Sequence, residues 1–211
     1  MAGSNAIADL RSGLGAVDDV LSFAKSGVGK PTKKEQSLFV ASVALSYAVW
    51  ENYVEEVAIE VTEFLASEVA ESSVPETVRD WIMNAQPKPT AWDLTVHPGW
   101  RELWIRMVRA RAKGEEGKER DFGILSANAK AVAGLFDRVG VEPFARVSVA
   151  DQKKLDNLVE ERGQIVHTGK APDKFRKKNA TDWRAFVEQL SEEVDASIAT
   201  GAKKLTGKSP W

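Results

Sequence analysis

Residues 32–68 read TKKEQSLFVASVALSYAVWENYVEEVAIEVTEFLASE, and this stretch decides the fold. Thr32 and Glu35 have the spacing of a capping box, in which each side chain binds a backbone N–H group that the start of a helix leaves unpaired. Apolar residues follow at helical spacing, and no glycine or proline interrupts the chain before Pro75. We therefore expect one very long helix of about 35–40 residues, roughly 55 Å from end to end.

The other face of this helix is acidic. Six glutamates lie along it: Glu51, Glu55, Glu56, Glu60, Glu63 and Glu68. The plain interpretation of such a row of charges is a face in contact with solvent.

Helical signals dominate the rest of the chain as well. They predict an N-terminal helix within residues 1–31, a short helix after Pro75, and helices at 100–112, 126–139, 148–168 and 181–205. Gly13 and Gly15 are expected to weaken the first of these. Residues 86–98 contain three prolines and are expected to form a loop, and residues 206–211 a flexible tail. No stretch has the period of two typical of a strand, so we expect an all-α helical bundle forming one domain over residues 1–211.

The composition excludes several classes of site. With 29 basic and 31 acidic residues, the net charge of −2 rules out a uniformly basic coat for nucleic acid but not a local basic patch. The absence of cysteine excludes disulfides, thiolate metal sites and cysteine nucleophiles. We expect no metal and no cofactor. No secretory signal and no run of about 18 apolar residues is present, so we expect a cytoplasmic location and no membrane contact.

Only two histidines could carry protons near neutral pH, His97 and His167. His97 lies in a Val-His-Pro-Gly loop without a partner in sequence, and we interpret it as a surface or capping residue. His167 ends the run Glu161-Arg162-Gly163-Gln164-Ile165-Val166-His167, near the end of a predicted helix. An arginine five positions before a histidine is a weak pattern by itself, but its context adds to it.

The Arg162-x4-His167 motif resembles the signature of HEPN domains, a family of small all-helical RNA-cleaving proteins. The motif follows apolar residues on one helix and runs into Thr168-Gly169, much as family members run into a short turn. Residues 47–54, YAVWENYV, resemble the aromatic-flanked glutamate in the long helix of the RiboL-PSP-HEPN branch. Residues 127–140 resemble the helix that precedes the motif in that branch. The likeness extends loosely over residues 32–200.

The resemblance implies a metal-independent endoribonuclease in which the RNA 2′-OH attacks the neighbouring phosphate. His167 would act as general acid–base catalyst, and Arg162 would stabilise the charge on the phosphorus oxygens through its forked guanidinium. Glu51 could orient His167 or position the nucleophile, or it could simply be polar on a long helix. Positions five apart on an ideal helix are separated by about 140°, so one subunit does not close a tight pocket with this pair. The resemblance implies a homodimer in which two motifs line one cleft.

Several residues around the motif are candidates for RNA contacts. They are Gln164 within the motif and the cations Lys170, Lys174, Arg176, Lys177 and Lys178 after it. A second basic group lies in the predicted helix at 100–112 and just beyond it: Arg101, Arg106, Arg109, Arg111 and Lys113. Such residues hold phosphates without reading sequence. A solvated loop and a solvated helix face are the alternatives.

Other functions stay open. Family members usually have a polar residue after the motif arginine, where this chain has Gly163. That departure favours the alternative of a non-catalytic HEPN module that binds RNA, a nucleotide or a protein partner. In a plain helical interaction protein, Arg162 would pair with Glu160 or Glu161, and His167 would interact with the helix C-terminus. The resemblance suggests a toxin with an antitoxin partner, or an antiviral defence effector.

Overall fold

A computed structural model describes residues 3–25, 30–85, 88–95, 99–114, 123–124, 126–172 and 175–211. Over these residues the chain is helical and contains no strand, which confirms the all-α prediction. The elements are α1 (Asn5–Ser22), α2 (Lys33–Glu68), the 3₁₀ turn η1 (Glu71–Ser73), α3 (Glu76–Met83), α4 (Ala91–Thr95), α5 (Gly99–Lys113), α6 (Ala129–Val139), α7 (Val149–Thr168) and α8 (Lys177–Thr206). Within the described part of the chain, no helix is both long and apolar enough to cross a membrane.

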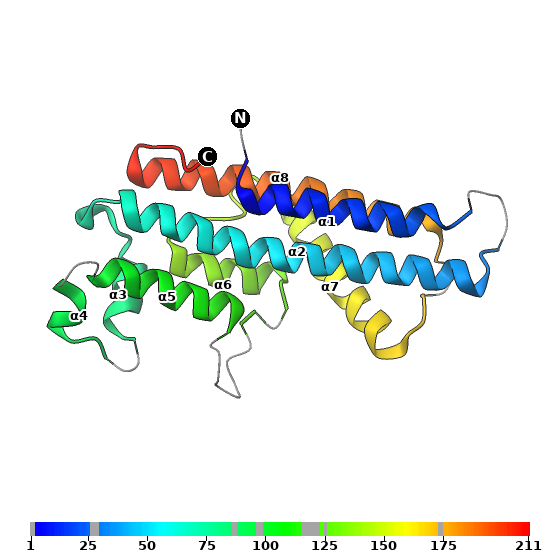
Figure 1. The fold of residues 1–211 in the computed structure, drawn as a ribbon, viewed down its shortest axis with the longest axis horizontal. Helices are drawn as coiled ribbons and strands as arrows, with labels where there is room; N and C mark the ends of the chain where they lie inside the picture. Colours follow the sequence, from blue (N-terminus) through cyan, green and yellow to red (C-terminus); the bar gives the residue numbers. More distant parts are fainter. Residues whose placement is uncertain are drawn as a thin grey trace.

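The long helix α2 is the axis of the molecule. Its 36 residues span about 54 Å, and the predicted capping box between Thr32 and Glu35 is present. Helix α8 runs beside α2 along most of its length and α1 along about half of it, and α5 and α6 lie against its other side near the opposite end from the α1–α2 connection (Figure 1). Helix α7 crosses α2 obliquely, so its C-terminal end leaves the bundle (Figure 1).

Helices α1 and α2 approach each other closely at Gly13. A Cβ atom on Gly13 would lie 2.8 Å from a methyl group of Val49, closer than packing allows. The sequence suggested that this glycine weakens its helix. The structure adds a compensating role, because the missing side chain is what lets the two helices touch.

The acidic face of α2 remains partly exposed to solvent, yet four of its six glutamates also have partners. These four bind groups on other elements: Glu56 pairs with Lys113, Glu63 with Arg109 at 2.7 Å and Glu68 with Lys208 at 2.6 Å, while Glu60 accepts the backbone N–H groups of Asn5 and Ala6 at 2.9 and 3.1 Å. The row therefore fastens α5, the chain end and the start of α1 to the central helix.

Three predicted boundaries are wrong for local reasons. Residues 91–95 form the short helix α4 inside the stretch predicted as a loop. Helix α6 begins at Ala129 rather than at residue 126, since the Asn128 side chain caps it by accepting the N–H of Ala131 at 2.8 Å. Helix α8 begins at Lys177 rather than Thr181, because the Asn179 side chain accepts the N–H of Arg176 at 2.9 Å.

The end of the chain folds back on the bundle. Helix α8 stops at Gly207, which has a φ of 76°. The Lys208 ammonium then reaches Glu68, and Trp211 packs against the hydrophobic core. The segment 206–211, expected to form a flexible tail, thus makes contacts with α2 and the core.

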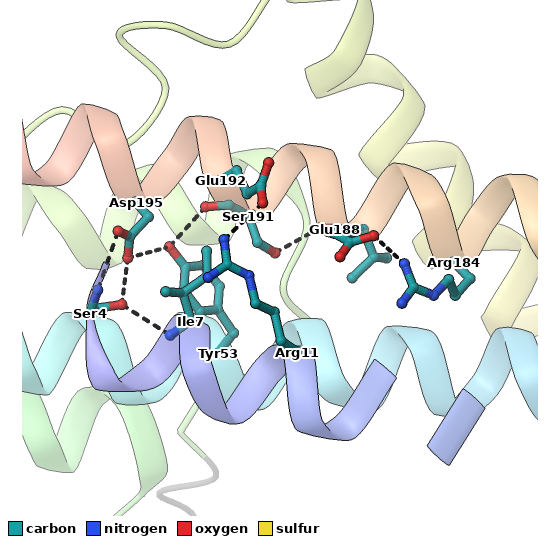
Figure 2. Close-up of polar contacts among 10 residues, drawn as sticks. Ser4, Ile7, Arg11, Tyr53, Arg184, Glu188, Ser191, Glu192 and Asp195 are labelled. Atoms are coloured by element: carbon teal, nitrogen blue, oxygen red, sulfur yellow. Dashed lines mark hydrogen bonds and ion pairs between the residues drawn. The ribbon is translucent and has the colours of Figure 1, made fainter. Parts of the chain in front are cut away.

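A buried polar network joins α1, α2 and α8 (Figure 2). The Ser4 hydroxyl caps α1 by accepting the N–H of Ile7 at 3.0 Å and donates to the Asp195 carboxylate on α8. Tyr53 of α2, which is fully buried, donates to the backbone oxygen of Ser191 at 3.2 Å beside Asp195. Burial raises the pKa of Asp195, an effect that the hydrogen bonds from Ser4 oppose. The network aligns three helices through groups that are costly to leave unpaired.

We expect Ser4→Ala to lower the free energy of unfolding by about 1–3 kcal/mol, because it removes the helix cap and one partner of a buried carboxylate. The matched control is Ser12→Ala, which changes an exposed serine on the same helix and should stay within about 0.5 kcal/mol of wild type. Urea denaturation followed by circular dichroism measures both. Equal stabilities for the two variants would contradict the role of the network.

Candidate functional site

The predicted motif lies in the last two turns of α7. Ser148 caps this helix by accepting the N–H of Asp151 at 3.0 Å, and Gly169, with a φ of 64°, ends it. Leu158 and Ile165 face the core. The predicted helix at 148–168 is thus confirmed to within one residue.

Arg162 lies over an aromatic ring of α2. Its guanidinium carbon is 4.9 Å from the ring centroid of Tyr47. Among the described residues no ion pair or hydrogen bond involves the Arg162 side chain, so the expected alternative of pairing with Glu160 or Glu161 is not formed. A cation–π contact holds the arginine while leaving its N–H donors directed elsewhere.

Tyr47 is fixed by two hydrogen bonds at its hydroxyl. The hydroxyl donates to the Glu51 carboxylate at 2.9 Å and accepts the N–H of Ala127 at 2.8 Å. Trp50, one turn along α2, donates its indole N–H to the carbonyl of Ala127 at 2.8 Å. We call Arg162, Tyr47 and Glu51 the tyrosine cluster. It links α2 to α7, and the hydrogen bond from Ala127 connects it to the segment before α6.

Sequence reasoning identified Arg162 and Glu51 but missed Tyr47 as the residue between them. The signal that could have found it is the spacing of Tyr47 and Glu51, four positions apart on one helix, which places their side chains side by side. Burial raises the pKa of Tyr47, so the phenol stays protonated and remains a donor to Glu51.

Glu55, one turn beyond Glu51, has the most altered acidity of this surface. Burial and, after it, the neighbouring charge of Glu51 raise its pKa to about 7, while Lys113 opposes the shift. The sequence marked Glu55 only as part of a solvated face. Its half-buried position beside a second carboxylate is what makes it titrate near neutral pH.

His167 is exposed in the last turn of α7 and is not brought into contact with Arg162 or Glu51 by any hydrogen bond among the described residues. Gln164 is exposed as well. A Cβ atom on Gly163 would meet nothing within 4 Å, so packing does not require a glycine there. The structure thus unites Arg162 with Glu51 through Tyr47 and leaves His167 apart, on the solvent side of the same helix end.

The basic residues after the motif have mixed roles. Lys170 is exposed, Lys178 pairs with Asp182 at 2.6 Å, and Lys177 donates to the carbonyl of Ala24 at 3.0 Å, which ties α8 to the end of α1. Arg176 occupies the position before α8. Lys174, like His97, lies outside the described residues.

On α5, three of the five candidate cations are engaged with acids. Arg109 and Lys113 bind glutamates of α2, and Arg101 lies 3.7 Å from Glu71. Arg106 and Arg111 are exposed. The α5 group is therefore largely structural, whereas the region around the end of α7 keeps exposed cations.

No group of three or more candidate metal ligands occurs within the described ranges. No family model, no curated protein and no solved structure matches this chain.

The raised pKa of Glu55 predicts a pH-dependent stability. Folded Glu55 holds its proton up to about pH 7, whereas an unfolded glutamate loses it near 4.5, so the folded state binds more protons between these values. Stability from this group is therefore lost as the pH rises through that window. We expect Glu55→Gln to be more stable than wild type at about pH 8 and to lose this advantage at about pH 4.5.

Denaturation at a series of pH values measures the effect. Glu102→Gln, which changes an exposed glutamate on α5, is the matched control. A wild-type and a Glu55→Gln protein whose stabilities change in parallel from about pH 4.5 to 8 would show that Glu55 is not the titrating group.

Proposed function

We propose that this protein is a metal-independent endoribonuclease of the HEPN type, acting through Arg162 and His167. The observation that carries the proposal is the position of Arg162 over the Tyr47 ring, without a carboxylate partner, near the helix end that carries exposed His167. A guanidinium so held keeps its fork of donors for a phosphate, and an imidazole is the side chain that most often serves as general acid or base. The resemblance of the motif and of residues 47–54 to HEPN domains also supports the proposal.

The reaction needs only groups that this chain contains. An imidazole takes the proton of the 2′-OH, the O2′–P bond forms, and the P–O5′ bond breaks as the leaving oxygen receives a proton from an imidazolium. Arg162 binds the non-bridging oxygens, on which negative charge builds up. The products are a 2′,3′-cyclic phosphate and a 5′-hydroxyl.

Two subunits supply the two proton carriers in this proposal. Arg162 and His167 differ by about 140° around α7, so a second copy of α7 is the simplest source of the partner histidine. Glu51 acts indirectly: it accepts a hydrogen bond from the Tyr47 hydroxyl and so fixes the ring that Arg162 contacts. We assign to Glu51 a positioning role rather than contact with substrate.

The biological setting that we propose is a toxin controlled by an antitoxin, or an effector of antiviral defence. The alternative is a non-catalytic module that binds RNA, a nucleotide or a protein partner. Gly163 favours the alternative, because the residue beside the arginine has no side chain with which to contact substrate.

We expect the purified protein to cut single-stranded RNA in the presence of EDTA and to leave cyclic phosphate ends. Arg162→Ala and His167→Ala should each reduce the rate by about 10²–10⁴-fold, and the double variant should be little worse, because the two groups act as a unit. Arg162→Lys should also be poor, since a point charge does not reproduce the guanidinium fork. Gel electrophoresis of labelled RNA, with end-group analysis, measures the outcome.

The matched control is Arg106→Ala, which removes an exposed arginine from α5 and should cut at the wild-type rate. A substrate with a 2′-deoxy sugar at the scissile position should resist cleavage. Undiminished cutting by His167→Ala, or a strict requirement for Mg²⁺, would place the chemistry elsewhere. Failure of the wild type to cut any RNA would favour the binding module.

We expect a two-fold dimer in solution with the C-terminal end of α7 at its interface. Val166, which is 54% exposed and adjacent to His167, gives a test of this position. Val166→Glu should convert the dimer to monomer, because a charge would be buried unpaired in the interface. Val149→Glu changes an 82% exposed valine at the other end of the same helix and should stay dimeric. Light scattering that finds only monomer for the wild type at micromolar concentration would contradict the dimer.

A further inference from the structure

A groove of about 430 Å³ lies between α7 and α8, and no residue of the tyrosine cluster lines it. Its lining includes Lys154 and Glu161 from α7 and Asn179, Trp183, Phe186 and Gln189 from α8. This volume lies in the range of pockets that bind one small organic molecule. We call it the α7/α8 groove.

Two aromatic side chains line this groove, the half-buried Trp183 and the buried Phe186. Trp183 and Phe186 meet edge to face, with ring centroids 5.9 Å apart and planes at 67°. The ammonium of Lys154, an exposed side chain, rests 4.2 Å from the Phe186 centroid and 5.9 Å from that of Trp183. Because Lys154 is exposed and can move away, the half-buried Trp183 is the ring that a group from solvent can reach.

A carboxylate lies at the edge of the same aromatic wall. Glu161 accepts the indole N–H of Trp183 at 3.0 Å, and this bond fixes both side chains. Glu161 is half-buried, and no ion pair reaches it from the described residues. A carboxylate offers about four acceptor sites, so after one bond from Trp183 it can still accept two more donors.

A stacking face beside an unpaired carboxylate fits one kind of nucleobase. Guanine has two adjacent donors on its Watson–Crick edge, N1–H and the N2 amino group, which can converge on the Glu161 oxygen that the Trp183 bond leaves free. Adenine places an acceptor, N1, beside its amino group, and that acceptor would face the carboxylate. Bases of unpaired RNA are recognised in this way, by stacking on aromatic side chains and by hydrogen bonds to the Watson–Crick edge.

We propose that the α7/α8 groove binds a guanine nucleotide of single-stranded RNA, with the base against Trp183 and its Watson–Crick edge on Glu161. Lys154 leaves the rings when the base enters and binds the nucleotide's phosphate. As a site for RNA substrate this rests on the proposed function, and it adds a preference for guanine beside the cleaved bond. Glu161 and Arg162 are consecutive and point about 100° apart on α7, so a strand that crosses the helix reaches both.

Binding of free nucleotides tests the groove without relying on cleavage. Isothermal titration calorimetry of the full chain with 5′-GMP and 5′-AMP should detect GMP and give an affinity for AMP that is weaker by about 10-fold or more. Trp183→Leu should weaken GMP by about 10-fold, the loss of one aromatic stack. Glu161→Gln should remove the preference for GMP over AMP. Trp183→Phe keeps an aromatic ring and should retain most of the GMP affinity. This variant tests the stacking role even where the leucine variant does not fold.

The matched control is Trp92→Leu, which changes a 74% exposed tryptophan on α4 and should leave GMP binding unchanged. His167→Ala should also bind GMP as wild type does, whether or not the protein cuts RNA. Equal affinities for GMP and AMP, no binding of either at millimolar concentration, or wild-type binding by Trp183→Leu would each overturn the groove proposal. RNA cleavage alongside any of these results would leave the proposed function standing, whereas GMP binding without cleavage would support the groove and the binding module.

Discussion

The structure depends on the burial of one helix that is too long to be covered by any single neighbour. Helix α2 buries Val43, Trp50, Val57 and Leu65 at points distributed along about 54 Å. It contacts α1 and α8 along one side and α5, α6 and α7 on others, so nearly every long element packs against it. An isolated helix gains little stability in water, and burial of its apolar surface by these neighbours is what makes so long a helix stable.

Polar side chains on the same helix also position the start of α1 and the segment before α6. Glu60 accepts the first N–H groups of α1, supplying from α2 the negative charge that the start of α1 lacks in its own sequence. Tyr47 and Trp50 hold both the N–H and the carbonyl of Ala127, so the chain before α6 has a fixed path. Because Tyr47 also supports Arg162, the packing of the core and the geometry of the candidate site rest on one side chain.

Local signals in the sequence predicted most elements, and long-range pairing explains most of what was missed. The capping box at Thr32 and the glycines at 140 and 169 act within one turn, so spacing alone reveals them. The partnership of Glu63 with Arg109 spans 46 positions, and its existence follows only from the way α5 lies on α2. The bond between Trp183 and Glu161 likewise joins residues 22 positions apart on two different helices. The predicted start of α6 at residue 126 was early for a smaller reason, since serine and asparagine both cap helices and only two positions separate Ser126 from the observed cap, Asn128.

The placement of Arg162 on a ring rather than on a carboxylate has a consequence for any phosphate that approaches α7. An arginine paired with an acid must break that pair before it binds an anion, and the released carboxylate then repels the anion. A cation–π contact is worth about 0.5–2 kcal/mol and adds no negative charge beside the guanidinium. Glu51, the acid of the cluster, is engaged by the Tyr47 hydroxyl and forms no ion pair with Arg162 among the described residues. The tyrosine therefore supports the cation and also occupies the neighbouring carboxylate, an arrangement that suits the phosphate binding that we propose for Arg162.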